Sequence, residues 1–179
     1  MREMLRLGGR LFLIALVSGL ALGATYFVTK EPIERQKALA SANARGQVID
    51  GVAIPDEDAV LTGNIRSVLV TADGGRVIEV AATGYGGEFL VTVGIESGGT
   101  ITGVIIGENN ETVGLGKNAE KPEFTGQYVN QNVELTLVKD GAGEGMIDAL
   151  TGATITSRAV TDAVNEARSY ALTLGGDGK

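Results

Sequence analysis

The sequence predicts an α+β fold, with one N-terminal transmembrane helix followed by a mainly antiparallel sheet domain with flanking helices. Three patterns predict it. Residues 11–28 are uncharged and mostly apolar, residues 66–107 alternate β-branched runs with glycine-rich turns, and residues 157–172 repeat apolar side chains at helical spacing. A chain of 179 residues that is 44% hydrophobic can bury the core of one ordinary domain and carry appendages besides.

Residues 11–28 are expected to form a single transmembrane helix, because 18 residues at about 1.5 Å each nearly cross an apolar layer of about 30 Å. The flanking charges are Arg2, Glu3, Arg6 and Arg10 before the segment and Lys30, Glu31, Glu34 and Arg35 after it. Since unbalanced basic residues stay on the cytoplasmic side, we expect a single-pass protein of the cell (inner) membrane with a cytoplasmic N-terminus. The residues also leave open a cleaved secretory signal, with a cleavage site near Ala21 and Gly23.

The segment after the anchor predicts a stalk. Pro32 suits the first turn of a helix, residues 33–45 are rich in helix formers, and the helix is expected to end near Gly46. Residues 46–63 contain an acidic cluster and read as a connecting loop. We therefore expect a cytoplasmic tip and transmembrane anchor at residues 1–30, a stalk helix and linker at 31–63, and a globular domain at 64–179.

The globular domain is expected to begin with an antiparallel meander of about four strands. The strand-like runs lie at residues 67–71, 77–80, 89–93 and 100–106, with turn signals at 73–75, 84–87 and 97–99. Residues 111–128 are expected to be irregular, residues 133–138 to form one more strand, and residues 141–145 to form a loop. The helix at 157–172 has an apolar face of Val160, Ala163, Val164, Ala167 and Ala171.

Composition excludes several kinds of chemistry. The chain has no His, Cys or Trp, so nucleophilic catalysis with a His partner, zinc sites built on Cys or His, and Cys-ligated iron–sulfur clusters are impossible. Redox chemistry would need an organic cofactor. Four of the 15 basic and one of the 22 acidic side chains lie within residues 1–30, so residues 31–179 carry a net charge of −10. Such a domain repels nucleic acid and anionic lipid.

Residues 148–157 stand directly before the last predicted helix. The start of a helix offers unpaired N–H groups and a positive dipole end, and the small residues here would let a phosphate approach closely. The simpler interpretation is capping, in which Thr156 or Ser157 closes the helix and Gly152 makes a tight turn. The residues alone leave both interpretations open.

The same stretch resembles a known motif. It contains Asp148, then two other residues, then Thr151, Gly152, Ala153 and Thr154. This order is similar to the flavinylation motif of the FMN-binding domain family, in which FMN is attached through its phosphate to the hydroxyl of the final Thr or Ser. The likeness continues into the helix, through residues 154–160. By this resemblance Thr154 is the attachment residue and Asp148 belongs to the motif that a flavin transferase reads.

Two further stretches agree with the same family, in the same order along the chain. Residues 84–87, followed by a strand that ends at 94–95, form one of them. Residues 111–116 are similar to the family's Glu-Thr-Pro-Gly-Leu-Gly, with Val113 in place of the usual Pro. The replacement could loosen the loop but removes no functional group. The resemblance makes residues 64–179 an FMN-binding domain.

With one anchor and one such domain, the chain resembles the G subunits of Rnf complexes, the ion-translocating ferredoxin:NAD oxidoreductases. The C subunit of the sodium-pumping NADH:quinone reductase has a similar plan and is usually longer. The resemblance implies an electron-transfer subunit with covalent FMN and no activity alone. Its implied partners are the A, B, C, D and E types of Rnf membrane subunit and a flavin transferase. The alternatives are a C-type subunit of the Na+-translocating NADH:quinone reductase, a stand-alone extracytoplasmic flavoprotein and a non-redox scaffold subunit.

The expected cofactor site combines the motif with the two other stretches. Besides Thr154, its residues are Asp148, Thr151, Gly152, Ala153, Thr156, Tyr85, Glu111, Thr112, Leu115, Gly116 and Lys117. Thr151, Gly152 and Thr156 are placed to donate to phosphate and ribityl oxygens, although Thr156 suits an N-cap equally well. Tyr85 and Leu115 are candidates for packing on the isoalloxazine ring. Lys117 could supply charge there, or could simply be solvated. We expect no metal site.

Overall fold

The computed structural model describes residues 2–57, 59–138 and 144–175. The chain divides into two compact units, Met1–Ala40 and Ser41–Lys179. Helix α1, Arg2–Val48, supplies the first unit and continues into the second. It is the one helix among the described residues that is long and apolar enough to cross a membrane. The fold is α+β, as the sequence predicts.

Helix α1 differs from the prediction in being continuous. The sequence predicts an anchor at residues 11–28 and a separate helix beginning at Pro32, whereas the structure has Pro32 inside one helix. Proline lacks an N–H and therefore removes one hydrogen bond from a helix, but Lys30 and Glu31 before it and the strong helix formers of residues 34–40 after it continue the helix. The helix ends at Val48, two residues beyond the predicted end near Gly46.

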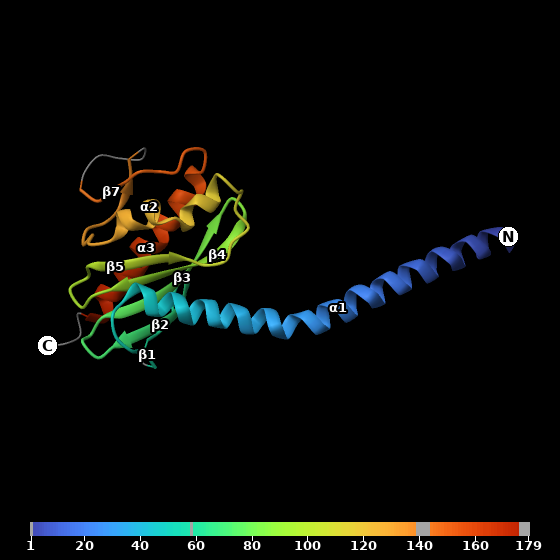
Figure 1. The fold of residues 1–179 in the computed structure, drawn as a ribbon, viewed down its shortest axis with the longest axis horizontal. Helices are drawn as coiled ribbons and strands as arrows, with labels where there is room; N and C mark the ends of the chain where they lie inside the picture. Colours follow the sequence, from blue (N-terminus) through green and yellow to red (C-terminus); the bar gives the residue numbers. More distant parts are fainter. Residues whose placement is uncertain (1, 58, 139–143, 176–179) are drawn as a thin grey trace. The chain divides into compact units, whose positions relative to one another are not determined.

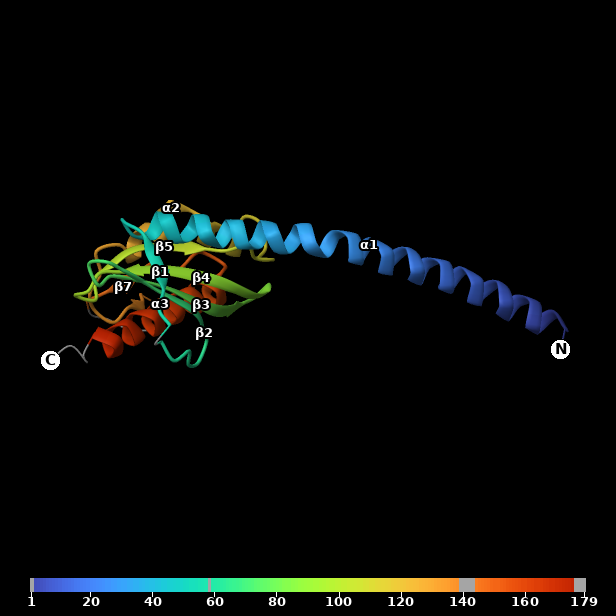
Figure 2. The same cartoon turned by 90° about the horizontal axis from the view of Figure 1, so that it is seen from below.

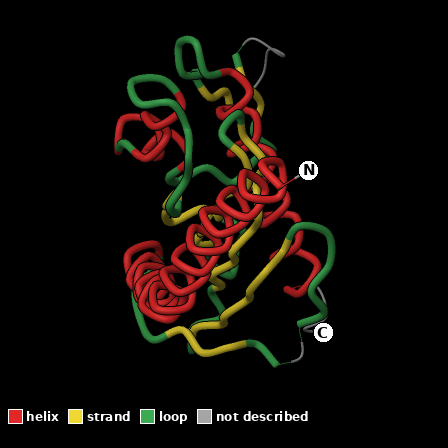
Figure 3. The backbone as a smooth tube through the Cα atoms, turned by 90° about the vertical axis from the view of Figure 1, so that its right-hand side faces the viewer, coloured by secondary structure: helices red, strands yellow, loops and turns green. Residues whose placement is uncertain are grey.

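Five antiparallel strands form the main sheet in the order in which they occur along the chain (Figure 1). They are β1 Ala53–Pro55, β2 Ile65–Thr71, β3 Arg76–Gly84, β4 Gly87–Ile95 and β5 Ile101–Ile106. Short loops join β2 to β5 in succession. Figure 3 draws strands in yellow and loops in green. The predicted four-strand meander is confirmed. The linker predicted at residues 46–63 also contributes β1, which pairs with β2 at the edge of the sheet.

The strand predicted at residues 133–138 is wrong in extent. Only β6, Thr136–Leu137, is strand, and it pairs in parallel with β7, Met146–Ile147, in a separate small sheet. The side chain of Asn165 explains the difference, because its Oδ1 accepts the N–H of Leu135 at 2.9 Å and its Nδ2 donates to the Leu135 carbonyl at 2.8 Å. A side-chain amide thus replaces a neighbouring strand there. Residues 139–143 of the predicted loop region lie outside the described residues.

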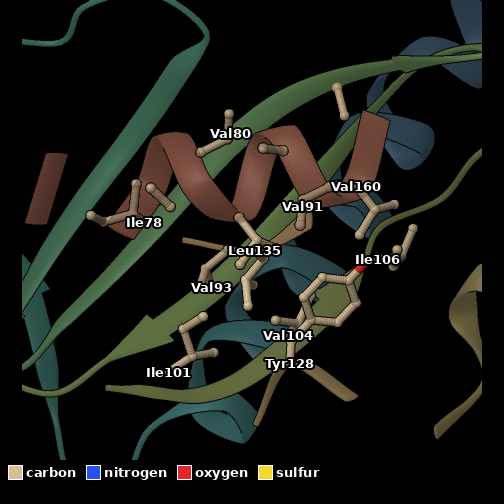
Figure 4. Packing of buried hydrophobic residues seen from close by; sticks show 14 of the residues in the cluster. Ile78, Val80, Val91, Val93, Ile101, Val104, Ile106, Tyr128, Leu135 and Val160 are labelled. Carbon is tan, nitrogen blue, oxygen red and sulfur yellow. The ribbon is translucent and has the colours of Figure 1, made fainter. Parts of the chain in front are cut away.

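Helices cover both faces of the main sheet. Figure 2 shows helix α3, Thr154–Gly175, against one face and residues 41–48 of α1 against the other. The face toward α3 holds the larger core, where side chains from β3, β4 and β5 meet Tyr128 and Val160 (Figure 4). All five residues of the predicted apolar face of α3 are buried. The segment between β5 and β6 turns through η1 Gly116–Glu120, α2 Pro122–Thr125 and η2 Gly126–Tyr128, short turns in a region predicted to lack a long helix.

The end of α1 is fixed to the sheet by backbone contact. A Cβ on Gly94 would meet the carbonyl of Val48, and one on Gly103 would lie 2.9 Å from the Val48 Cα, so only glycine lets the helix end approach β4 and β5 this closely. The hydroxyl of Thr102 donates to the Val48 carbonyl, one of the orphan acceptors of the helix end.

A buried carboxylate on β3 adds a polar contact to the same helix end. Arg45 Nη2 lies 2.6 Å from Glu79 Oε2, and Ser41 donates its hydroxyl hydrogen to Glu79 Oε1. Burial by itself raises the pKa of Glu79, but the hydrogen bonds from Arg45 and Ser41 and the positive charge of Arg45 outweigh burial and lower it below its ordinary value. Glu79 therefore stays ionised and paired within the domain.

Candidate functional site

A cavity of about 530 Å³ opens between three segments that are distant in the sequence. The β3–β4 hairpin contributes its tip, where Tyr85 and Gly86 join Gly84 to Gly87. The loop after β5 and the start of α3 complete the walls. The lining residues are Tyr85, Glu111, Thr112, Leu115, Gly116, Gly152, Ala153, Thr154, Ile155 and Thr156. The volume is typical of a site for a small molecule or cofactor.

The turn before α3 directs the start of that helix at the cavity. Gly152 has a φ of 75°, a conformation that favours glycine, and the N–H of Ala153 bonds the Leu150 carbonyl at 3.0 Å. The hydroxyl of Ser157 donates to the Ala153 carbonyl at 3.0 Å and accepts the Leu150 N–H at 2.9 Å. The first backbone bond of the helix runs from Ser157 to Ala153, so the N–H groups at 154–156 precede it and are available to an anion.

Thr154 is the first residue of α3, and it lines the cavity. Its side chain is half-buried, and within the described residues its hydroxyl makes no hydrogen bond. The first turn of α3 contains no acidic side chain. A hydroxyl oxygen thus stands at the positive end of a 22-residue helix, where a negatively charged substituent is stabilised.

Glu111 joins the three walls of the cavity. Its Oε1 accepts the N–H of Gly86 at 2.9 Å, and its Oε2 accepts the hydroxyl of Thr156 at 2.8 Å. The side chain is buried although it lines the cavity. A Cβ on either Gly84 or Gly116 would meet this carboxylate, so glycine at both positions makes space for it. Hairpin, loop and helix are all held at one acidic side chain.

A second group of polar residues supports the loop after β5 that contains Glu111, which we call the Glu111 loop. Asn109 accepts the Glu111 N–H on its Oδ1 at 3.2 Å and donates from Nδ2 to Glu120 at 2.7 Å. Lys117 donates to the Asn109 carbonyl at 3.1 Å and pairs with Glu120 at 2.8 Å. The ammonium of Lys117 is therefore committed to its own loop, and Lys117 does not line the cavity.

The structure brings together nine of the twelve site residues predicted from the sequence. Asp148, Thr151 and Lys117 do not line the cavity. Asp148 is exposed, and its backbone N–H and carbonyl face the side-chain amide of Gln127 at 2.8 and 3.4 Å. Sequence reasoning missed Ile155, which lies between two predicted residues. An earlier start for α3 would have drawn attention to it, because consecutive residues at the start of a helix share its open end.

The capping interpretation of Thr156 and Ser157 is wrong. Helix α3 begins at Thr154, three residues before the predicted start, so both residues lie inside its first turns. The Thr156 hydroxyl donates to Glu111, a residue 45 positions earlier, and the Ser157 hydroxyl bonds backward to the Ala153 carbonyl. Neither side chain accepts the N–H groups that an N-cap residue would satisfy.

Two protein families match this chain. Residues 84–169 match the FMN-binding domain, and residues 1–48 match the RnfG N-terminal region. The first match covers the tip of the β3–β4 hairpin, the loop after β5 that contains Glu111 and most of α3, which together form the cavity. The second covers all of α1.

Solved structures share the fold. The C subunit of a Na(+)-translocating NADH-quinone reductase from Parabacteroides distasonis has a TM-score of 0.53 at 17% identity, covering 74% of this chain and 80% of its own. NqrC from Shewanella oneidensis also has a TM-score of 0.53, at 21% identity, covering 75% and 74%.

Curated relatives match over nearly the whole chain. The G subunit of a proton-translocating ferredoxin:NAD(+) oxidoreductase complex from Clostridium ljungdahlii is 34% identical, covering 89% of this chain and 87% of its own. The Na(+)-translocating counterpart from Acetobacterium woodii is 35% identical with the same coverage. The G subunit of an ion-translocating oxidoreductase complex from Vibrio cholerae is 32% identical, covering 89% and 86%. The chain therefore belongs to the family of G subunits of the ion-translocating Rnf oxidoreductase complexes.

Proposed function

We propose that this chain is the electron-transfer G subunit of a membrane ion-translocating ferredoxin:NAD oxidoreductase complex, and that it carries FMN through a phosphoester to Thr154. The position of Thr154 carries the proposal. It is the final residue of the motif that begins at Asp148, it opens α3, and its hydroxyl lines the cavity without a partner among the described residues. The FMN-binding domain match and the named relatives support the cofactor and the complex.

The residues of the cavity fit FMN. A phosphodiester at Thr154 keeps one negative charge, which the N-terminal end of α3 stabilises by roughly 0.3–1 kcal/mol, and by more when partly buried. Thr154, Ile155 and Thr156 provide backbone N–H groups at that point, and Thr112 provides a hydroxyl. When bound, the flavin supplies the capacity to accept and release electrons.

The apolar side chains of the cavity suit the isoalloxazine ring. Tyr85 is 77% exposed at the hairpin tip, Ile155 is 54% exposed and Leu115 is 42% exposed, so three apolar groups stand at the mouth of the cavity. In water these groups would remain hydrated, whereas a planar ring bound against them would release that water. We assign Tyr85 and Leu115 to ring packing, and add Ile155. Lys117 is assigned a supporting role in the loop rather than a cofactor contact.

Maturation requires an enzyme to reach the motif. Asp148, Thr151 and Gly152 are exposed, so the part of the motif that precedes α3 is accessible to a flavin transferase. We propose that Asp148 and Thr151 serve recognition by that enzyme and that Thr154 alone receives the flavin. This division explains why two motif residues lie outside the cavity.

We propose residues 1–30 as the cytoplasmic tip and anchor, 31–63 as stalk and linker, and 64–179 as the FMN domain. The FMN domain then lies on the extracytoplasmic side of the cell membrane, in contact with the other Rnf subunits. In sealed vesicles, an impermeant amine reagent should label Lys121, which is exposed, only when the extracytoplasmic face is outward. Labelling of inside-out vesicles would reverse the orientation. Lys139, a second lysine expected to react, lies outside the described residues.

Denaturing-gel fluorescence tests the attachment. The wild-type chain and its Thr154→Ser and Thr154→Ala variants are co-expressed with the transferase and compared with Thr173→Ala, which removes an exposed hydroxyl from the other end of α3. We expect a fluorescent band for wild type, for Thr154→Ser and for the Thr173→Ala control, and none for Thr154→Ala, which still folds and inserts. Equal fluorescence in Thr154→Ala would refute the attachment site. Ferredoxin:NAD turnover by the isolated chain would refute the subunit assignment and favour a stand-alone flavoprotein.

A further inference from the structure

We propose that the carboxylate of Glu111 sets the reduction potential of the flavin to a low value, as the fixed negative charge of the cavity. The inference rests on the proposed function, since it concerns the FMN that the cavity would hold. It assigns Glu111 an electrostatic role beyond holding the cavity walls together.

The described residues that line the cavity bring negative charge and no positive charge. Apart from the phenol of Tyr85, Glu111 has the one ionisable side chain among the described residues that line the cavity. The nearest candidate cation along the loop, Lys117, donates to Asn109 and pairs with Glu120 instead. The cavity wall therefore carries a carboxylate without a basic side chain beside it.

The carboxylate is also fixed in place. Its two oxygens accept hydrogen bonds from different walls, from the Gly86 N–H at 2.9 Å and the Thr156 hydroxyl at 2.8 Å. The backbone N–H of Glu111 donates to the side-chain oxygen of Asn109. Gly84 and Gly116 enclose the carboxylate closely, since a Cβ on either would meet it. Burial and these hydrogen bonds keep the carboxylate in one position in the cavity wall.

A fixed negative charge opposes any further negative charge nearby, and the opposition is stronger in a partly buried site than in water. Reduction adds electron density to an isoalloxazine ring, so a neighbouring carboxylate disfavours the reduced state and lowers the potential. Neutralising the carboxylate without changing its shape should raise the potential. By Coulomb's law at an effective dielectric constant of about 20, removing one unit charge within about 12 Å of the ring should raise the ratio of reduced to oxidised flavin at a given electrode potential at least tenfold.

Redox titration of the FMN-loaded full-length chain in detergent, followed by visible absorbance, tests this. Glu111→Gln keeps the size and an acceptor oxygen but removes the charge, whereas Glu111→Asp keeps the charge and shortens the side chain. Glu123→Gln removes an exposed carboxylate of α2 that does not line the cavity, and is the matched control. We expect a more positive potential for Glu111→Gln alone, with Glu111→Asp and Glu123→Gln close to wild type.

The outcomes separate this inference from the proposed function. Absence of protein-bound flavin in the wild-type chain would contradict the proposed function. Bound flavin with the same potential in Glu111→Gln as in wild type would overturn the charge role. An equal rise in Glu111→Gln and Glu111→Asp would also overturn it, because fit rather than charge would then set the potential. Circular dichroism of each apo protein verifies folding, and if Glu111→Gln fails to fold, a rise in Glu111→Asp relative to Glu123→Gln overturns the inference.

Discussion

Replacing Gly86 with alanine should destabilise the domain strongly. Its added Cβ would meet the carbonyl oxygen of Asn110 and would lie 2.5 Å from the Asn110 carbonyl carbon and 2.8 Å from the Glu111 nitrogen. All three are backbone atoms, so no flexible side chain can move aside. Overpacking of this kind costs about 1–3 kcal/mol, and displacing the Gly86 N–H from the Glu111 carboxylate adds a charge-assisted hydrogen bond to the loss.

The combined cost in the free energy of unfolding is roughly 2–4 kcal/mol. For a unit the size of Ser41–Lys179, each kcal/mol lowers Tm by roughly 4 °C, so Gly86→Ala should melt about 8–16 °C below wild type. Thermal unfolding of the detergent-solubilised chain, followed by circular dichroism at a helical wavelength, measures this. Gly126→Ala is the matched control, because its Cβ would meet nothing within 4 Å and its φ of −64° suits alanine. Equal Tm values for the two variants would refute the close-packing argument around Glu111.

Two further predictions concern the core. Arg45→Met should leave the Glu79 carboxylate buried without its cation and lower the free energy of unfolding by about 2–4 kcal/mol at neutral pH, measured by denaturant titration. The pKa of Glu79 is lowered on folding, so in wild type its contribution to the free energy of unfolding is present above the ordinary pKa of 4.5 and is lost as the pH falls through the folded pKa. Arg45→Met should lose less stability on acidification. An identical dependence of stability on pH in the two proteins would contradict this. Tyr128→Phe should cost only about 0.5–1.5 kcal/mol by the same titration, because the Thr161 hydroxyl, 2.9 Å from the Tyr128 oxygen, still bonds the Ser157 carbonyl; a loss above about 3 kcal/mol would contradict this.

Local patterns predicted the elements of this fold well. The β-branched runs and glycine-rich turns of residues 66–107 predicted the meander, because strand and turn preferences depend on residues that are neighbours in the sequence. The periodic apolar face of α3 was predicted for the same reason, and all of its residues are buried. The extra edge strand β1 was missed because three residues carry too short a pattern to stand out from a linker.

Contacts between distant segments could not be predicted from local patterns. The start of α3 was placed at Ser157 because a run of Thr and Ser suggests caps, yet Thr156 is engaged by Glu111 from another segment and stays inside the helix. The replacement of a strand partner by Asn165 at Leu135 is equally invisible in sequence. For the site, motif resemblance named residues on all three walls, but only the fold separates Thr154, which lines the cavity, from Asp148, which faces solvent.

Peptide mass mapping of the chain isolated with its native membrane complex tests the central claim most directly. Trypsin should release residues 140–158, which contain four hydroxyl side chains, those of Thr151, Thr154, Thr156 and Ser157. The account predicts that this peptide is heavier by about 438 Da, the mass of FMN joined with loss of water, and that fragmentation places the addition on Thr154. An unmodified peptide from complex that contains flavin, or an addition on any of the other three hydroxyls, would contradict it.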